Sequence, residues 1–173
     1  MFRSPFMNAV IEMAEECRNG EVPVAAAIVF EGKIVAISTN DVETSGIPWR
    51  HAEFVAISEA LKKLGVRYLD KASLYVTLEP CAFCSAAIEK VRMRDIFFGA
   101  YDTKCGAIAH TIRLFDHSMV KPRIIGGIQE ERCSSILRKF FGKMRSTGKR
   151  NVIEDEVEQS FDDAWSVLEA GSR

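Results

Sequence analysis

Two short motifs carry the residue types that zinc chemistry requires. His51 is followed two residues later by Glu53, and Cys81 is followed three residues later by Cys84. One imidazole and two thiolates form a mixed ligand set that zinc accepts, and three protein ligands leave the fourth tetrahedral position for a water molecule. Glu53 is not needed as a ligand, so its carboxylate can carry protons to and from that water. The motifs predict a catalytic zinc site with Glu53 as the general acid and base.

Each motif is predicted to lie in the first turn of a helix. Apolar residues have helical spacing over residues 51–64 and again over 81–91, and a β-rich run at 74–78 separates the two. Cysteines at positions i and i+3 share one helix face, and a helix N-terminus stabilises the thiolates that a metal requires. The spacing of the two cysteines therefore suits metal binding.

The other elements also alternate between helix and strand. Residues 40–49 are rich in Asn, Thr, Ser, Gly and Pro and are predicted to form the loop that leads to His51. The alternation predicts an α/β fold with helices layered on a sheet. The predicted helices cover residues 6–17 and 129–144, and the predicted strands cover 22–30, 33–39, 95–100 and 123–125, the first two joined by a turn at Glu31-Gly32.

Composition indicates a single domain without a membrane span. The 173 residues suffice for one compact domain, and no apolar run is long enough to cross a bilayer. The N-terminus lacks the apolar core of a secretory signal, and five cysteines with a Cys-x-x-Cys pair favour thiolate chemistry over a disulfide framework. These features lead us to expect a cytoplasmic protein.

The charge changes sign near residue 151. The net charge of the whole chain is −1, but its charges are unevenly distributed. Residues 138–150 are strongly basic, and residues 154–163 are acidic. We therefore expect the zinc domain to cover residues 1–150 and an acidic tail to cover 151–173. The spacing of Phe161, Trp165 and Leu168 predicts a short helix in that tail.

The two motifs resemble the signature of the cytidine deaminase-like zinc deaminases. The matching runs are His51-Ala52-Glu53 and Thr77-Leu78-Glu79-Pro80-Cys81-Ala82-Phe83-Cys84. Within that superfamily the chain is most similar to the bacterial tRNA adenosine deaminases, through further stretches at residues 21–24, 98–104 and 140–141. It departs from them at Ala25-Ala26, where Gly-Ala is common, and at Phe83, where Met is frequent.

The resemblance implies a fold, a reaction and partners. The fold would be a three-layer α/β/α sandwich around a mixed sheet of about five strands. The reaction would be the hydrolytic deamination of adenosine to inosine at the wobble position of tRNA, with a zinc-activated water as the nucleophile. The partners would be the tRNA anticodon loop and a second copy of the chain in a homodimer.

The resemblance also implies substrate contacts outside the two motifs. Asn40 would hydrogen-bond the nucleoside near its base or ribose. Asp102 and Lys104, which follow a predicted core strand, would contact the nucleotides that flank the target, and Phe141 would stack on a base. The remaining predicted substrate-binding residues are Val22, Pro23 and Ala52, the last through its backbone N–H.

Two other interpretations of the motifs stay open. The same zinc site could deaminate a free base or nucleoside, such as guanine or cytosine, in a closed pocket. Alternatively, a fourth ligand such as Cys105 or His110 could close the metal site, which would make the chain a non-catalytic zinc or nucleic-acid-binding module. The presence of Glu53 beside His51 argues against the second alternative.

Overall fold

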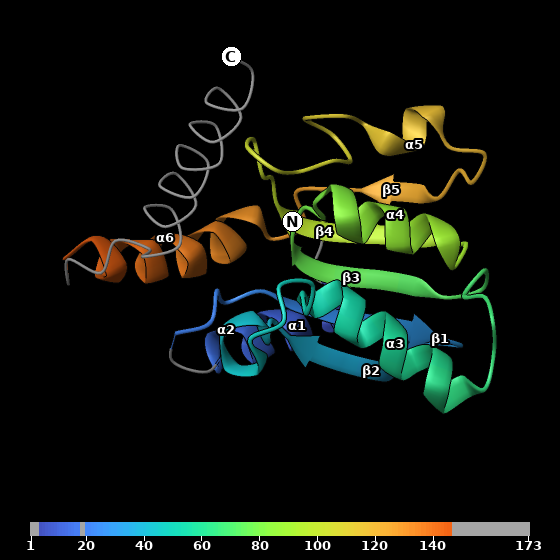
Figure 1. Cartoon of the computed structure of the whole chain (residues 1–173), viewed down its shortest axis with the longest axis horizontal. Coiled ribbons are helices and arrows are strands. Elements are labelled where there is room, and N and C mark those ends of the chain that lie inside the picture. The colour runs from blue at the N-terminus through green and yellow to red at the C-terminus, as the bar shows by residue number, and fades with distance from the viewer. Residues whose placement is uncertain (1–3, 18–19, 147–173) are drawn as a thin grey trace, which may run out of the picture. The chain divides into compact units, whose positions relative to one another are not determined.

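The computed structural model describes residues 4–17 and 20–146 (Figure 1). The chain divides into two compact units, residues 1–137 and 138–173, and the boundary falls inside the last helix, α6 (Glu130–Ser146). The predicted acidic tail at 151–173 lies outside the described residues. Within the part of the chain that is described, no helix is long and apolar enough to span a membrane.

The centre of the first unit is a five-stranded mixed sheet with the strand order β2-β1-β3-β4-β5. Strand β1 pairs antiparallel with both of its neighbours, whereas β3, β4 and β5 run parallel. The predicted α/β fold with a mixed sheet of about five strands is therefore confirmed. The strands are β1 (Ala25–Phe30), β2 (Lys33–Thr39), β3 (Ser73–Leu78), β4 (Asp95–Ala100) and β5 (Arg123–Ile125).

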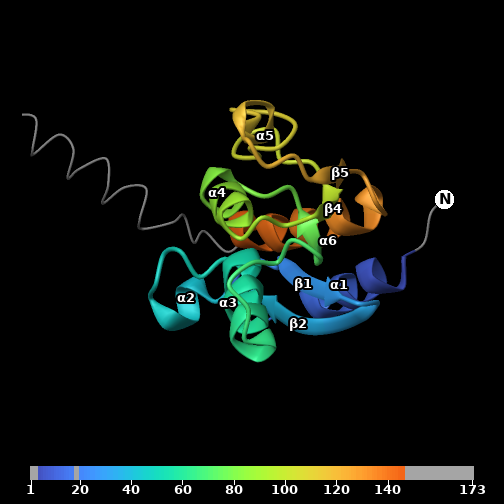
Figure 2. The same ribbon diagram turned by 90° about the vertical axis from the view of Figure 1, so that its right-hand side faces the viewer.

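Helices cover both faces of the sheet, and alternate strand residues supply a hydrophobic core on each face. Ala26, Ile28 and Val76 pack under α3 (Ala52–Leu64) and α4 (Ala82–Lys90). Ala25 and Ala27 pack on the other side, under α1 (Pro5–Glu15) and the start of α6. The period of two in the strands thus produces three layers, as Figures 1 and 2 show.

The predicted turn at Glu31-Gly32 joins strands β1 and β2. Glu31 and Gly32 have φ angles of 49° and 72°, as a two-residue turn of the type favoured between twisted strands requires. Strand β1 begins at Ala25 and not at Val22, since Pro23 has no N–H to donate to a ladder.

Two short helices occupy segments that were not predicted to be helical. They are α2 (Val42–Ser45), inside the predicted loop, and α5 (Leu114–His117). Each has four residues, which is too short for an amphipathic period to be visible in the sequence. The buried carboxylate of Glu21 accepts hydrogen bonds from the N–H groups of Val42 and Thr44 and so stabilises the start of α2.

Candidate active site

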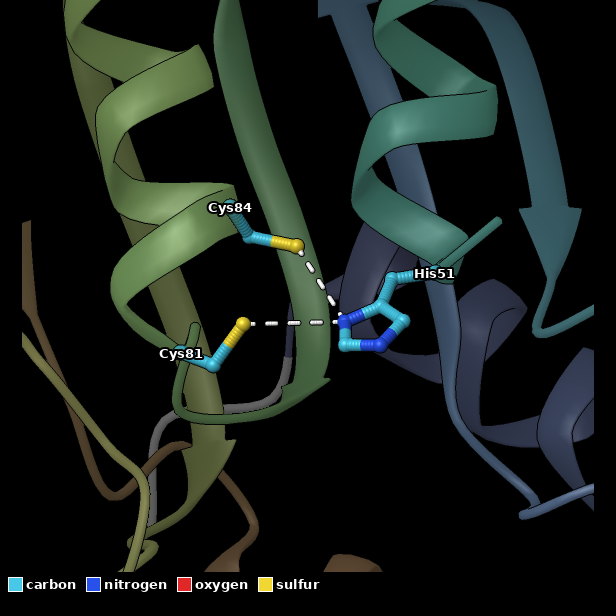
Figure 3. Close-up of side chains that lie close together, drawn as sticks. All are labelled: His51, Cys81 and Cys84. Atoms are coloured by element: carbon cyan, nitrogen blue, oxygen red, sulfur yellow. Dashed lines mark hydrogen bonds between the residues drawn. The ribbon is translucent and has the colours of Figure 1, made fainter. Parts of the chain in front are cut away.

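The structure brings together the three residues that were predicted to hold a metal. His51 is the N-cap of α3, Cys81 is the N-cap of α4, and Cys84 lies in the first turn of α4. The Nδ1 atom of His51 is 3.6 Å from Sγ of Cys81 and 3.5 Å from Sγ of Cys84 (Figure 3). The three ligand atoms all lie within 4.8 Å of one another. One metal ion can therefore contact all three.

The sheet explains why these side chains meet. Strands β3 and β4 are parallel, so their carboxyl termini lie at the same end of the sheet, where Leu78 pairs with Ala100. Glu79 and Pro80 follow this end of β3 and lead directly to the first cysteine. The loop before α3 is closed by an ion pair between Arg50 Nε and Asp41 Oδ2 at 2.7 Å, which leads the chain to His51 at the same end.

The two thiols shift each other's pKa in opposite directions. The pKa of the Cys81 thiol is lowered to about 4, chiefly by a hydrogen bond from Cys84 and further by a hydrogen bond with His51. The same bond and burial raise the pKa of Cys84. Hydrogen bonding to Cys81 also raises the pKa of His51. A metal ion has to displace these protons, and a neutral imidazole with two thiolates at helix N-termini fits zinc.

Glu53 lies beside this cluster in the first turn of α3. Its side chain is buried, and burial raises its pKa to about 7, with a smaller opposing effect from the charge on His51 and a hydrogen bond from Cys84. A carboxyl group with a pKa near neutrality both accepts and donates protons readily at physiological pH. The proton-transfer role of Glu53 stays a prediction.

Asn40 and Ala52 are linked to each other. The backbone N–H of Ala52 donates a hydrogen bond of 3.2 Å to Oδ1 of Asn40. Because an N–H group can only donate, this bond fixes the oxygen end of the amide toward α3 and turns the NH₂ end away from it. Asn40 also donates its own N–H to the carbonyl of Val24, so it lies next to the segment that contains Val22 and Pro23.

Glu79 was not among the predicted site residues, yet it holds the loop that carries several of them. Its buried carboxylate accepts hydrogen bonds from the N–H groups of Asp102, Ile108 and Ala109 and pairs with Nδ1 of His110 at 2.7 Å. Burial alone would raise the pKa of Glu79, but these hydrogen bonds outweigh it and lower the pKa. Glu79 therefore carries a negative charge at neutral pH.

The loop after β4 passes directly beside the metal ligands. Gly106 forms a β-bridge with Cys81, and a Cβ atom at this position would lie 2.4 Å from Cδ of Glu79. Oδ1 of Asp102 accepts the N–H groups of Lys104 and Cys105. The carboxylate of Asp102 thus shapes its own loop, while the Lys104 side chain is exposed. The signal for Glu79 in the sequence was a carboxylate at the end of a buried strand, directly before Pro80.

Phe83 is a second residue near the site for which the sequence predicted no role. It stands between the two cysteines, is 45% exposed, and packs its ring against Phe54 and edge-on toward His51, with centroids 5.3 and 6.5 Å apart.

Other predicted residues are not members of the candidate metal group. Among the described residues, the candidate metal group has three members, and neither Cys105 nor His110 is one of them. Phe141 belongs to the second unit, where its ring packs edge to face against Phe140 at 5.2 Å.

The fold and the cluster define a class of protein. A mixed five-stranded sheet that presents one histidine and two cysteines at the N-termini of adjacent helices is the arrangement of the zinc-binding nucleobase deaminases. The family model of the cytidine and deoxycytidylate deaminase zinc-binding region matches residues 2–100, and the chain belongs to this family.

The chain is also similar to curated proteins over most of their length. It is 40% identical over 131 residues to the tRNA-specific adenosine deaminase of Rickettsia typhi, which covers 73% of this chain and 88% of that protein. It is 36% identical over 148 residues to the tRNA-specific adenosine deaminase of Aquifex aeolicus, which covers 84% of this chain and 98% of that protein.

Solved structures agree with the fold. One comes from studies of A-to-I editing by tRNA deaminases at the wobble position; it is 36% identical, has a TM-score of 0.75, and covers 78% of this chain and 100% of its own. A guanine deaminase from Bacillus subtilis is 38% identical with a TM-score of 0.55, but covers only 58% of this chain and 66% of its own. The similarity to the tRNA enzyme therefore extends over more of the molecule.

Proposed function

We propose that this protein deaminates adenosine to inosine at the wobble position of tRNA. The observation that carries the proposal is the cluster of His51, Cys81 and Cys84 with the buried Glu53 beside it. The cluster lies in a chain that resembles tRNA-specific adenosine deaminases over most of its length. The reaction consumes one water and releases one ammonia.

His51, Cys81 and Cys84 would hold a zinc ion, and Glu53 would move the protons. Zinc bound at this site would supply an activated water for attack on the C6 carbon of adenine. Glu53 would accept one proton from that water and pass it to the ring nitrogen beside C6. It would then take the proton that remains on the attacking oxygen and deliver it to the amine, which leaves as ammonia, so that one carboxyl group serves as base and acid in turn.

Asn40 would orient the target nucleoside. Its oxygen is held by the N–H of Ala52, so its NH₂ group is the end that can donate to an acceptor on the base or ribose. Ala52 would thus contribute to substrate binding indirectly, because its backbone N–H holds the Asn40 side chain in this orientation. Val22 and Pro23, beside Asn40, would form an apolar wall next to the nucleoside.

The nucleotides on either side of the target would contact the loop after β4. Asp102 keeps this loop in shape through its bonds to the N–H groups of Lys104 and Cys105, and the exposed Lys104 suits a phosphate. Phe141 would contribute a stacking surface for a base. The proposal further includes a homodimer and a cytoplasmic location, where tRNA is available.

Deamination of free guanine is the second candidate, favoured by the similarity to a guanine deaminase. The zinc-loaded protein should be incubated separately with a tRNA that has adenosine at the wobble position, with free adenosine and with guanine. We expect inosine in the digested tRNA and one ammonia per inosine, and no product with a Glu53→Gln variant. Ammonia from guanine without inosine in the tRNA would show that the substrate is the free base.

A further inference from the structure

The end of the sheet farthest from the metal cluster carries a group of positively charged side chains. Lys62 and Lys63 occupy the last turn of α3, and Arg67 and Lys71 lie in the loop that follows. Arg92 and Arg94 lie between α4 and β4. All six are exposed, and we call them the basic end. The chain has a net charge of −1, so negative charge must be in excess elsewhere.

The backbone holds these segments together. The N–H of Leu69 donates to the carbonyl of Val91 at 2.7 Å, and the N–H of Arg94 donates to the carbonyl of Ala72 at 3.3 Å. The loops after α3 and α4 therefore form one continuous surface. They turn at the same end of the sheet in Figure 1, and Figure 2 views the first unit from that end.

Several guanidinium groups at the basic end are held in place. Arg92 stacks over the ring of Tyr68 at 4.1 Å, with Arg67 at 5.5 Å from the same ring. The buried carboxylate of Asp95 binds Nε of Arg94 at 2.8 Å and Nε of Arg123, the first residue of β5, at 2.9 Å. Arg94 and Arg123 still expose 59% and 64% of their side chains, so both remain accessible to a partner in solution.

Arginines that are held in place, together with neighbouring lysines, are suited to bind the successive phosphates of a nucleic-acid backbone. Arginine binds phosphate through a planar fork, and restricting its motion before binding lowers the entropy cost of the contact. The exposed acidic residues at this end are Asp70, Glu59 on α3 and Glu31 in the β1–β2 turn, while Asp95 is buried beneath Arg94 and Arg123. The six lysines and arginines outnumber them, so the exposed charge is mainly positive. A polyanion is the partner that this surface fits.

The basic end is far from the site of the reaction. His51 is the N-cap of α3 and Lys63 lies in its last turn, which at the helical rise per residue separates their backbones by about 18 Å. Phosphates of the nucleotides next to the wobble position cannot reach across this distance. A polyanion bound here would have to be another part of a larger RNA.

We propose that the basic end binds the sugar-phosphate backbone of the substrate tRNA outside its anticodon stem-loop. This inference rests on the proposed function, because that function supplies the polyanion. The contact would add affinity without taking part in catalysis, and it would favour an intact tRNA over a short RNA with the same anticodon loop.

The test compares intact tRNA with its isolated anticodon stem-loop as substrates. The variant replaces Lys62, Arg67 and Lys71 by glutamine, since none of the three contacts Asp95 or the metal cluster. We expect the KM for intact tRNA to rise about tenfold with kcat unchanged, and the slope of log KM against log salt to fall by about two to three. The KM for the stem-loop should stay the same.

A single-charge control keeps the result specific. Lys71→Gln should raise the KM for intact tRNA, whereas Arg132→Gln, which removes an exposed positive charge near α1, should not. An unchanged KM and salt slope for intact tRNA in the triple variant would overturn the proposal, and so would an equal loss on both RNAs. If the wild-type protein deaminates neither RNA, the proposed function itself is wrong; the binding of intact tRNA, measured by fluorescence anisotropy, then tests the basic end separately.

Discussion

Two buried carboxyl groups lie within two residues of the candidate metal ligands, and their surroundings shift their pKa values in opposite directions. Burial raises the pKa of Glu53 to about 7. At Glu79, burial has the same tendency, but backbone N–H groups and His110 outweigh it and lower the pKa. Glu53 is therefore suited to exchange protons, and Glu79 is suited to remain a fixed anion that accepts hydrogen bonds.

Replacing Glu53 by glutamine should separate catalysis from metal binding. The amide keeps the size of the side chain but cannot take a proton from water, so we expect kcat to fall by at least about a hundredfold. Zinc content should remain near one per chain, because Glu53 is not among the three grouped ligands. Metal analysis and the rate of inosine formation would check both statements, and loss of zinc together with activity would show that Glu53 acts as a ligand.

At the scale of the elements, the loop after β4 depends on Glu79. Hydrogen bonds from Asp102, Ile108 and Ala109 converge on this one carboxylate, which lies at the end of β3. The loop therefore has its shape set by a residue that is 23 to 30 positions earlier in the chain. The same loop carries Lys104, which we propose to contact the substrate.

Glu79→Gln should loosen this loop. An amide places an NH₂ group against donors and removes the charge, which we expect to cost about 1–3 kcal/mol and to lower Tm by roughly 3–10 °C. The KM for tRNA should rise more than kcat falls. Glu89→Gln is a matched control, because Glu89 binds the hydroxyl of Ser118 and not this loop. Equal changes of KM in both variants would contradict a specific role for Glu79.

The longer helices and the strands could be predicted from the sequence, because the spacing of their apolar residues and the turn residues between them are visible locally. Residues 95–100 and 123–125 are strands with the predicted bounds, and Gly65 ends α3 with a φ angle of 65° as a helix stop does. The short helices α2 and α5 escaped prediction because four residues carry no period. The roles of Glu21 and Glu79 could not be predicted, since their partners are backbone N–H groups far along the chain.

At the scale of the whole molecule, a zinc ion would connect two helices that a strand separates in the sequence. His51 begins α3 and Cys81 begins α4, with β3 between them. Any ligand that binds only the folded chain stabilises it in proportion to the logarithm of its concentration over its Kd. Zinc should therefore stabilise the fold, and chelation should destabilise it.

The stabilisation by zinc should depend on pH in a defined direction. The thiol of Cys84 has a raised pKa and must lose its proton when the metal binds, so zinc affinity falls as the pH falls. Because at least the Cys84 proton is released, the stabilisation at fixed zinc should decrease by at least about 1.4 kcal/mol for each unit of decreasing pH. Thermal unfolding with and without chelator at pH 6, 7 and 8 measures this change. A difference in Tm that does not vary with pH would exclude proton displacement.

The arrangement of the ligands also has a consequence for the order of events in folding. The β1–β2 hairpin needs only neighbouring residues, whereas His51 and Cys81 meet only after β3 has paired with β1 and with β4. Contacts that close long loops form late, since their entropy cost comes first. We therefore expect the ligand set to be completed only once these strands have paired, so that zinc would enter a chain whose central strands are already in place. Metal supply should therefore control the yield of active protein more than the rate at which it folds.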